Sequence, residues 1–318
     1  MIVPPKTPVI MQEGATFRTI ASLWKDEKKK YIKESSFAAY SLLLDNHLLP
    51  ILGEKTEISE KMVQDLVNEK LNEGLSQKTV KSILVVLKMV LKFGYKYGMC
   101  TYAPMEIRFP ANTCPKEVEV MTISDQKKMM NYLQSNFSFL NLGLSICLSS
   151  GLRIGEICAL KWEDIDTDAG IMKINKTIQR IYIKDGKGSH TEVKIGPPKT
   201  INSLREVPMT KELLSIIKPL KKVVPKENYV LSNSTKPIEP RLYRIHLKKV
   251  TDQLGIPNIK FHTLRHSFAT RCIESMCDYK TVSVILGHSS INTTLNLYVH
   301  PNLEQKKKCI DIMSKKLR

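Results

Sequence analysis

Ser-Ser-Gly-Leu-Arg-Ile-Gly-Glu-Ile-Cys-Ala-Leu-Lys-Trp occupies residues 149–162 of this 318-residue chain and follows directly on an apolar stretch. The apolar stretch predicts a buried helix that ends at Gly151, after which Arg153 opens a second helix with Glu156 three residues further on. Free backbone N–H groups at the start of a helix favour anions, so Arg153 is a candidate anion-binding residue. On these residues alone, an ordinary Arg–Glu pair is the simpler interpretation.

The charge of the whole chain predicts a polyanionic partner. Lys and Arg number 49 and Asp and Glu 31, which gives a formal net charge of +18 and a pI ≈ 9.5. Charge governs association and not fold, so a basic protein without such a partner stays open. Seven scattered cysteines without a Cys-x-x-Cys pair predict free thiols and no zinc site. We expect neither a secretory signal nor a membrane span.

The first part of the chain, residues 1–110, reads as a small bundle of helices. It carries 16 Lys and Arg against 12 Asp and Glu, whereas the remainder carries 33 against 19. Apolar residues at helical spacing predict four helices, with Ser36 capping the second and Ser76 capping the fourth. Lysines recur on one side of the fourth helix and are either phosphate contacts or a solvated face: Lys78, Lys81, Lys88 and Lys92.

The second part mixes helices with strands. Residues 99–121 contain three prolines and show no helical period, which predicts a linker between two domains. Alternation of residue types predicts one strand over 171–184, a second over 191–195 and a third over 205–209. From Thr210 to the end the pattern is helical again.

Two further motifs contain residues that can handle a phosphate group. The sequence Phe-His-Thr-Leu-Arg-His-Ser-Phe-Ala-Thr contains His262 and Arg265, which share one helix face. Arg offers a planar fork to two oxygens, and His can donate a hydrogen bond or move a proton. The sequence Ile-Leu-Gly-His-Ser-Ser-Ile-Asn-Thr-Thr-Leu-Asn-Leu-Tyr contains His288 in a turn and ends at Tyr298. Taken singly, a surface His–Arg pair and an interface tyrosine explain these residues as well.

Together the three motifs resemble the conserved boxes of the tyrosine recombinase (phage integrase) family, over roughly residues 17–310. A sixth family position, a lysine in a β-hairpin, is matched by Lys199 in Gly-Pro-Pro-Lys-Thr-Ile, with Lys187 and Lys194 nearby. The residue after the family's Lys-Thr is often basic, whereas here it is Ile201. Five residues stand in the family's order and contexts: Arg153, His262, Arg265, His288 and Tyr298.

The resemblance implies an α-rich fold of two domains. A small all-α helical bundle, the SAM-like core-binding domain, is expected over 17–98 after a short N-terminal segment, residues 1–16. A mixed α+β catalytic domain with a small antiparallel sheet, the DNA breaking-rejoining fold, is expected over 122–301. The tail over 302–318 either packs on a neighbouring subunit or is a frayed basic end.

The resemblance also implies a site-specific DNA recombinase that uses neither a metal nor a nucleotide cofactor. Tyr298 is the implied nucleophile, and it forms a 3′-phosphotyrosyl link that a new 5′-hydroxyl can reverse. Arg153 and Arg265 are expected to stabilise the charge that develops on the phosphate. The other implied roles belong to Lys199 as general acid, His262 as proton acceptor, His288 as phosphate hydrogen-bond donor and Glu156 as orienting residue.

The implied partners are double-stranded DNA sites of a mobile element, held in pairs by a homotetramer. Accessory DNA-bending or directionality proteins are a further implied class, and we expect a location in the bacterial cytoplasm and no membrane partner. Two other functions stay open at this point. One is a type IB topoisomerase-like DNA relaxer, and the other is a non-catalytic DNA-binding regulator with the same fold.

Overall fold

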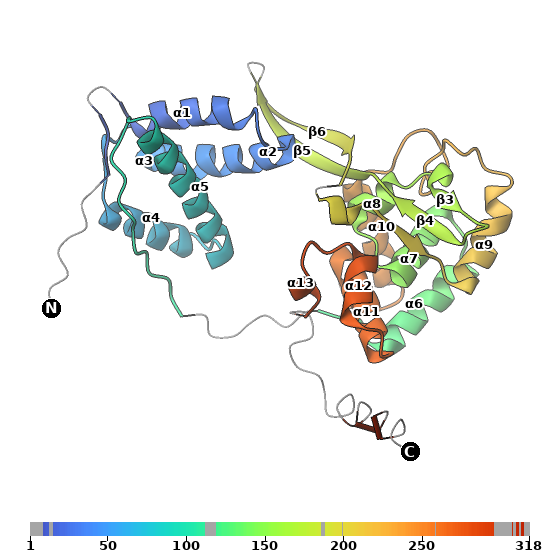
Figure 1. The fold of residues 1–318 in the computed structure, drawn as a ribbon. Coiled ribbons are helices and arrows are strands. Elements are labelled where there is room, and N and C mark those ends of the chain that lie inside the picture. Colours follow the sequence, from blue (N-terminus) through green and yellow to red (C-terminus); the bar gives the residue numbers. More distant parts are fainter. Residues whose placement is uncertain are drawn as a thin grey trace. The chain divides into compact units, whose positions relative to one another are not determined.

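The computed structural model describes residues 9–12, 15–111, 119–185, 188–198, 200–257, 259–295, 307, 310–311 and 313–314. Residue contacts divide the chain into two compact units (Figure 1). Unit 1 comprises Met1–Pro115 with Arg180–Glu192, and unit 2 comprises Lys116–Gln179 with Val193–Arg318. Among the described residues, no helix is both long and apolar enough to cross a membrane.

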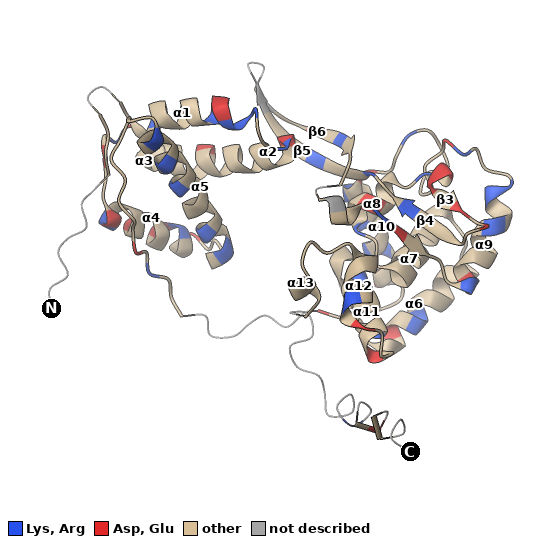
Figure 2. Ribbon diagram, in the orientation of Figure 1, with Lys and Arg blue, Asp and Glu red and all other residues tan. Residues whose placement is uncertain are grey.

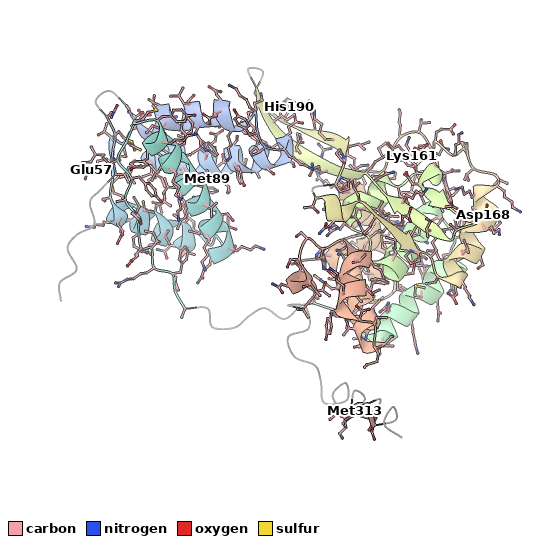
Figure 3. All side chains as sticks on the ribbon, viewed as in Figure 1. Glu57, Met89, Lys161, Asp168, His190 and Met313 are labelled. Carbon is pink, nitrogen blue, oxygen red and sulfur yellow. The ribbon has the colours of Figure 1, made fainter. Side chains whose placement is uncertain are left out.

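Unit 1 is mainly a bundle of helices, drawn with its side chains in Figure 3. Its buried apolar side chains form one core. A short antiparallel pair of strands, which the all-α expectation did not include, places Val9 opposite Ile58. The elements are β1 (Val9–Ile10), α1 (Phe17–Lys28), α2 (Glu34–Leu43), the π-helical turn η1 (Leu44–Leu48), α3 (Leu49–Leu52), β2 (Glu57–Ile58), α4 (Glu60–Asn72) and α5 (Gln77–Lys96).

The starts of two of these helices test the predicted caps. Ser76 caps α5, because its hydroxyl accepts a hydrogen bond from the Thr79 N–H at 3.1 Å. The cap predicted at Ser36 is wrong, since α2 already begins at Glu34. The Ser36 N–H donates to the carbonyl of Lys33 at 2.9 Å and is therefore inside the first turn. Glu34 favours this earlier start, because a carboxylate is stabilised by the positive end of the helix dipole.

The chain that follows α5 stays on unit 1 up to about residue 110. The Glu106 N–H donates to the carboxylate of Glu60 at 2.9 Å, and the Arg108 N–H donates to the side chain of Gln64 at 2.9 Å. Both acceptors belong to α4, so this stretch is tied down along that helix. The first residues of the segment predicted as a linker are thus anchored to the helical bundle.

Unit 2 combines helices with small sheets, and this α-rich arrangement confirms the predicted fold class. A three-stranded antiparallel sheet has the order β3-β4-β7, and β5 and β6 form a separate two-stranded sheet. The strands of the three-stranded sheet are β3 (Ile165–Asp166), β4 (Ile171–Ile174) and β7 (Arg205–Pro208). The other two are β5 (Thr177–Asp185) and β6 (Gly188–Gly196), of which residues 180–192 belong to unit 1. The helices are α6 (Ile123–Ser135), α7 (Phe139–Ser150), α8 (Ile154–Ala159), α9 (Lys211–Lys221), α10 (Pro240–Gln253), α11 (Phe261–Glu274), α12 (Tyr279–Leu286) and α13 (Ile291–Leu295), with 3₁₀ turns η2 (Trp162–Asp164) and η3 (Ile201–Ser203).

One expected strand proves to be two. The alternating stretch over 171–184 is split into β4 and β5, which belong to different sheets. Between them the Asn175 side chain donates to the carboxylate of Asp164 at 3.0 Å, which holds the chain where it leaves the first sheet. A run of alternating residues indicates a strand with one buried and one exposed face, and it carries no information about which strand each half will pair with.

The end of α7 brings three helices together. Gly151 has a φ of 65°, the left-handed conformation that glycine adopts without a steric penalty. A Cβ at this position would come within 2.6 Å of Phe268 on α11 and within 2.7 Å of Leu286 on α12. The α7–α8 turn is therefore packed directly against both helices, and Arg153 follows two residues later.

Candidate active site

Four of the predicted catalytic residues lie together at this junction. Arg153 precedes α8, His262 and Arg265 belong to α11, and His288 follows α12. Arg153 and Arg265 both donate to the carbonyl oxygen of Leu286, at 3.2 and 2.7 Å. Segments separated by more than a hundred residues in the sequence thus share one cluster.

The end of α12 organises the cluster through its backbone. The last carbonyls of a helix have no partner within the helix and form the negative end of its dipole, so cations are stabilised there. Three consecutive carbonyls each accept a hydrogen bond from a different guanidinium group: Ile285 from Arg205 Nε at 2.6 Å, Leu286 from Arg265 Nη2 at 2.7 Å, and Gly287 from Arg153 Nη2 at 3.0 Å.

Glu156 is the buried negative charge of the site, with 2% of its side chain exposed. Its Oε1 accepts from Arg153 Nη1 at 2.8 Å and from Arg205 Nη1 at 3.1 Å. Its Oε2 accepts from the Arg153 backbone N–H at 2.9 Å and from Arg205 Nη2 at 2.9 Å. Burial raises the pKa of Glu156, but the hydrogen bonds and charges of Arg205 and Arg153 outweigh it, so the pKa lies below its ordinary value. Glu156 is therefore ionised at neutral pH.

Arg205 is a site residue that the sequence motifs did not single out. It begins β7 opposite Ile174 of β4, and 4% of its side chain is exposed. It lies 49 residues from Glu156, with which it forms a two-pronged ion pair. The available sequence signal was a basic residue at the start of a strand, which does not distinguish a buried arginine from a surface one.

The arginines differ in their access to solvent. Arg153 keeps 34% of its side chain exposed, whereas Arg265 is 2% exposed. Burial, together with the neighbouring charge of Arg153, lowers the pKa of Arg265 to about 9, which still leaves it protonated at neutral pH. Arg265 also donates to the Gly151 carbonyl at 2.8 Å, so it is fixed between two helix ends.

The histidines of the site are neutral at physiological pH. Burial lowers the pKa of His288 to about 3, and the charges of Arg265 and Arg153 add to this effect. Partial burial and the same two arginines also lower the pKa of His262. The Nδ1 atom of His288 lies 2.8 Å from the hydroxyl of the fully buried Thr294, which fixes the orientation of the ring.

Two predicted residues, Lys199 and Tyr298, lie outside the described residues, as does Lys187. The turn that follows Lys199 is described, and the Asn202 side chain donates there to the His288 carbonyl at 3.5 Å.

The four lysines predicted as phosphate contacts belong to unit 1 and are exposed on α5 (Figure 2). Two of them lie over aromatic rings of the segment that follows α5. The ammonium group of Lys81 is 5.0 Å from the centre of the Phe109 ring, and that of Lys92 is 5.9 Å from the centre of the Tyr102 ring. These contacts orient the lysines without neutralising their charge.

Comparison with known protein families matches both units. The profile of the phage integrase family matches residues 119–305, and that of the phage integrase N-terminal SAM-like domain matches residues 16–71. The chain belongs to the phage integrase family. This confirms the family that the motifs around Arg153, His262 and His288 indicated.

Curated relatives of this integrase-family protein are named recombinases and integrases. A XerC-like tyrosine recombinase from Caldanaerobacter subterraneus subsp. tengcongensis is 31% identical, over 62% of this chain and 55% of the relative. Tyrosine recombinase XerD of Rickettsia bellii is 27% identical, over 60% and 63% of the two chains. The ICEBs1 integrase of Bacillus subtilis is 24% identical, over 60% and 53%. The aligned region thus spans little more than half the length of these relatives.

Solved structures share the fold over most of the chain. The Tn1549 transposon integrase in complex with transposon right end DNA superposes with a TM-score of 0.75 at 19% identity, covering 94% of this chain and 100% of that one. A lambda integrase tetramer bound to a Holliday junction superposes with a TM-score of 0.61 at 16% identity, covering 89% and 78%. At these identities the superpositions establish the fold alone.

Proposed function

We propose that this integrase-family protein is a site-specific DNA recombinase that integrates or excises a mobile element through a covalent 3′-phosphotyrosyl intermediate. The observation that carries the proposal is the convergence of Arg153, His262, Arg265 and His288 on the end of α12. The relatives named as tyrosine recombinases and integrases support the same function.

The reaction exchanges one phosphate ester for another. The phenolic oxygen of Tyr298 attacks the phosphorus while the bond from phosphorus to the 5′-oxygen breaks. His262 accepts the tyrosine proton, and Lys199 supplies a proton to the departing 5′-oxygen. The link to Tyr298 keeps the phosphate as a diester, so a 5′-hydroxyl from another strand can reverse the step and reseal the DNA.

The arginine cluster stabilises the charge that grows on the phosphate. Arg153 is the guanidinium that a phosphate reaches first, because a third of its side chain is exposed. Arg265 and Arg205 add positive charge from the buried side, and Glu156 offsets only part of it. Fixed charges in a site of low dielectric need no reorganisation during the reaction, which makes such stabilisation effective.

The neutral imidazoles suit the remaining two roles. A neutral His262 has a free lone pair with which to accept the Tyr298 proton. A neutral His288 whose Nδ1 accepts the Thr294 hydroxyl proton presents its Nε2–H as a donor to the phosphate. The proton-accepting role of His262 depends on the lowered pKa that partial burial and the arginines impose on this ring.

The proposed partners follow from charge and from the relatives. The exposed lysines of α5 contact phosphates of the DNA duplex, and affinity falls steeply as salt concentration rises. The lambda integrase tetramer on a Holliday junction supports a homotetramer on paired sites for this chain as well. We include accessory DNA-bending or directionality proteins and a cytoplasmic location in the proposal.

The test is a search for a protein–DNA adduct that survives denaturant. Nicked duplexes tiled across the DNA that flanks the gene are incubated with the protein, and the adduct is mapped to one phosphate. Tyr298→Phe is expected to form no adduct, because it lacks the nucleophilic oxygen. Tyr132→Phe is the matched control, since the Tyr132 hydroxyl on α6 donates to the side chain of Gln253 at the end of α10, at 2.9 Å.

Three results would contradict the proposal. An adduct formed by Tyr298→Phe would exclude Tyr298 as the nucleophile. Relaxation of plasmids that lack any mapped site would indicate a type IB topoisomerase-like relaxer. Tight binding without an adduct on every duplex would indicate a non-catalytic regulator.

A further inference from the structure

Arg205 connects three elements that surround the arginine cluster. Its backbone is held by the pairing of β7 with β4, where it lies opposite Ile174. Its Nε donates to the carbonyl of Ile285 on α12 at 2.6 Å, and its two terminal nitrogens reach Glu156 on α8. The side chain is 4% exposed, so it does not itself present a surface to a substrate.

The carboxylate of Glu156 is saturated by this arrangement. A carboxylate has about four lone-pair sites for hydrogen bonds. Arg205 occupies one on each oxygen, while the backbone N–H and one side-chain nitrogen of Arg153 occupy the other two. Arg153 is thereby limited to a single side-chain hydrogen bond with Glu156.

This limit matters because carboxylates and phosphates compete for the same guanidinium geometry. Arginine binds either group with two parallel hydrogen bonds. A Glu156 released by Arg205 would be free to engage both terminal nitrogens of Arg153. Arg153 would then turn toward the buried carboxylate and away from an incoming phosphate.

We propose that Arg205 is a positioning residue for Arg153. By hydrogen-bonding both oxygens of Glu156, Arg205 lets the carboxylate orient Arg153 through one side-chain hydrogen bond and prevents it from binding both terminal nitrogens of Arg153. The proposal rests on the proposed recombinase function, because the phosphate that Arg153 meets is the one to be cleaved. Arg205 contributes through Glu156 and the α12 carbonyls and does not touch the DNA.

The test compares cleavage of two DNA duplexes that differ in one atom group at the mapped phosphate. One is the natural phosphodiester, and the other is a methylphosphonate, in which a methyl group replaces a charged non-bridging oxygen. Cleavage of the phosphodiester develops more negative charge than cleavage of the methylphosphonate. A guanidinium that stabilises this charge therefore accelerates cleavage of the first duplex more than that of the second. The ratio of the two single-turnover strand-scission rates therefore reports on Arg153, whereas a loss of folded protein lowers both rates alike.

Arg205→Met is expected to lower this ratio by at least about tenfold, in the same direction as Arg153→Ala. Arg205→Lys is also expected to lower it, since an ammonium group keeps the charge but cannot bridge both oxygens of Glu156. In the double variant Arg153→Ala with Arg205→Met, the ratio should match that of Arg153→Ala alone, because the two changes act through one group.

Arg271→Met is the matched control. Arg271 lies on α11, donates to the Met121 carbonyl at 2.7 Å and pairs with Glu274, which resembles the surroundings of Arg205 without touching Arg153. Its ratio should stay within about twofold of the wild-type value, because its loss affects only folding.

An unchanged ratio in a folded Arg205→Lys or Arg205→Met protein would overturn the proposal and assign Arg205 to the fold alone. If Arg205→Met does not fold, Arg205→Lys decides the question. Failure of the recombinase function gives a different result, since the wild-type protein would then form no adduct on the phosphodiester.

Discussion

The two units hold their positive charges in opposite ways. On α5 of unit 1 the lysines are exposed, and aromatic rings orient two of them. In unit 2 the three clustered arginines, Arg153, Arg205 and Arg265, are packed at the end of α12 and are fixed by its backbone carbonyls and by one carboxylate. Exposed charges give affinity that salt can screen, whereas buried charges act at one place and are little affected by salt.

Under the proposed function, the α5 lysines would serve DNA binding and the buried arginines would serve the chemical step. A flexible lysine can contact any phosphate that comes near, so its individual placement matters little. A buried guanidinium acts only if it is already aimed at the reacting phosphate, because the surrounding groups cannot rearrange during the step. We therefore expect substitutions in unit 2 to have large and specific effects, and substitutions on α5 to have small and additive ones.

The largest effect is expected for Glu156→Gln. Removing the buried carboxylate leaves three guanidinium groups without a counter-charge, which should cost about 3–5 kcal/mol in the free energy of unfolding. Urea denaturation followed by circular dichroism measures this change. Glu163→Gln is the control, because Glu163 is 42% exposed and its pairs with lysines should contribute at most about 1 kcal/mol. Equal losses in both variants would contradict the assignment of Glu156 as the anchor of the cluster.

Arg153→Ala should reduce the rate of chemistry while leaving the fold intact. Glu156 keeps its two-pronged bond to Arg205 in this variant, so stability changes little. The single-turnover rate of adduct formation should fall by about 10²–10³-fold, the usual cost of removing one fixed donor to a developing oxyanion. A loss below about tenfold would mean that Arg153 does not meet the reacting phosphate.

The double variant Lys88→Gln with Lys92→Gln tests whether the exposed lysines of α5 contact phosphates of the DNA. Each lost phosphate contact should reduce the slope of log affinity against log salt concentration by about 0.9. Fluorescence anisotropy titrations from low to moderate salt measure the slope. Lys55→Gln removes an exposed lysine of unit 1 away from α5 and should leave the slope unchanged. If the α5 variant also keeps its slope, these lysines belong to a solvated face.

The last prediction concerns the pH dependence of stability. The pKa of His288 is about 3 in the folded protein and about 6.5 in an unfolded chain, so the unfolded state binds the extra proton between these values. The stability that comes from keeping this ring neutral is complete above pH ~6.5 and is lost as pH falls from there toward the folded value. The number of protons taken up on unfolding is obtained from the slope of the free energy of unfolding against pH. Near pH 5, His288→Gln should take up about one proton fewer than the wild-type protein, because it lacks the imidazole. An uptake equal to that of the wild-type protein would show that the imidazole is charged in the fold.

The sequence motifs located most of the site in advance. A helix start after a glycine placed Arg153 correctly, and the three-residue spacing to Glu156 correctly predicted their pair at 2.8 Å. Local spacing was sufficient there because the partners lie on one turn of one helix. The prediction of a cap at Ser36 was wrong for a reason that is also local. The carboxylate of Glu34 favours a helix that begins two residues earlier.

Arg205 shows where such reasoning stops. Its partners Glu156 and Ile285 lie 49 and 80 residues away, and nothing in its own strand marks it as buried. The same holds for the split of the stretch over 171–184, because alternation does not say which strand a segment will join.

By itself, the sequence determined the family and the α-rich two-part fold, and it predicted which residues handle the phosphate. Only the tertiary structure decided that three arginines share the last carbonyls of α12 and that Arg205 and Arg153 divide one carboxylate. The physical reason is that hydrophobic spacing and helix caps act over a few residues. A buried charge must instead find its partners wherever the packed helices bring them within hydrogen-bonding distance.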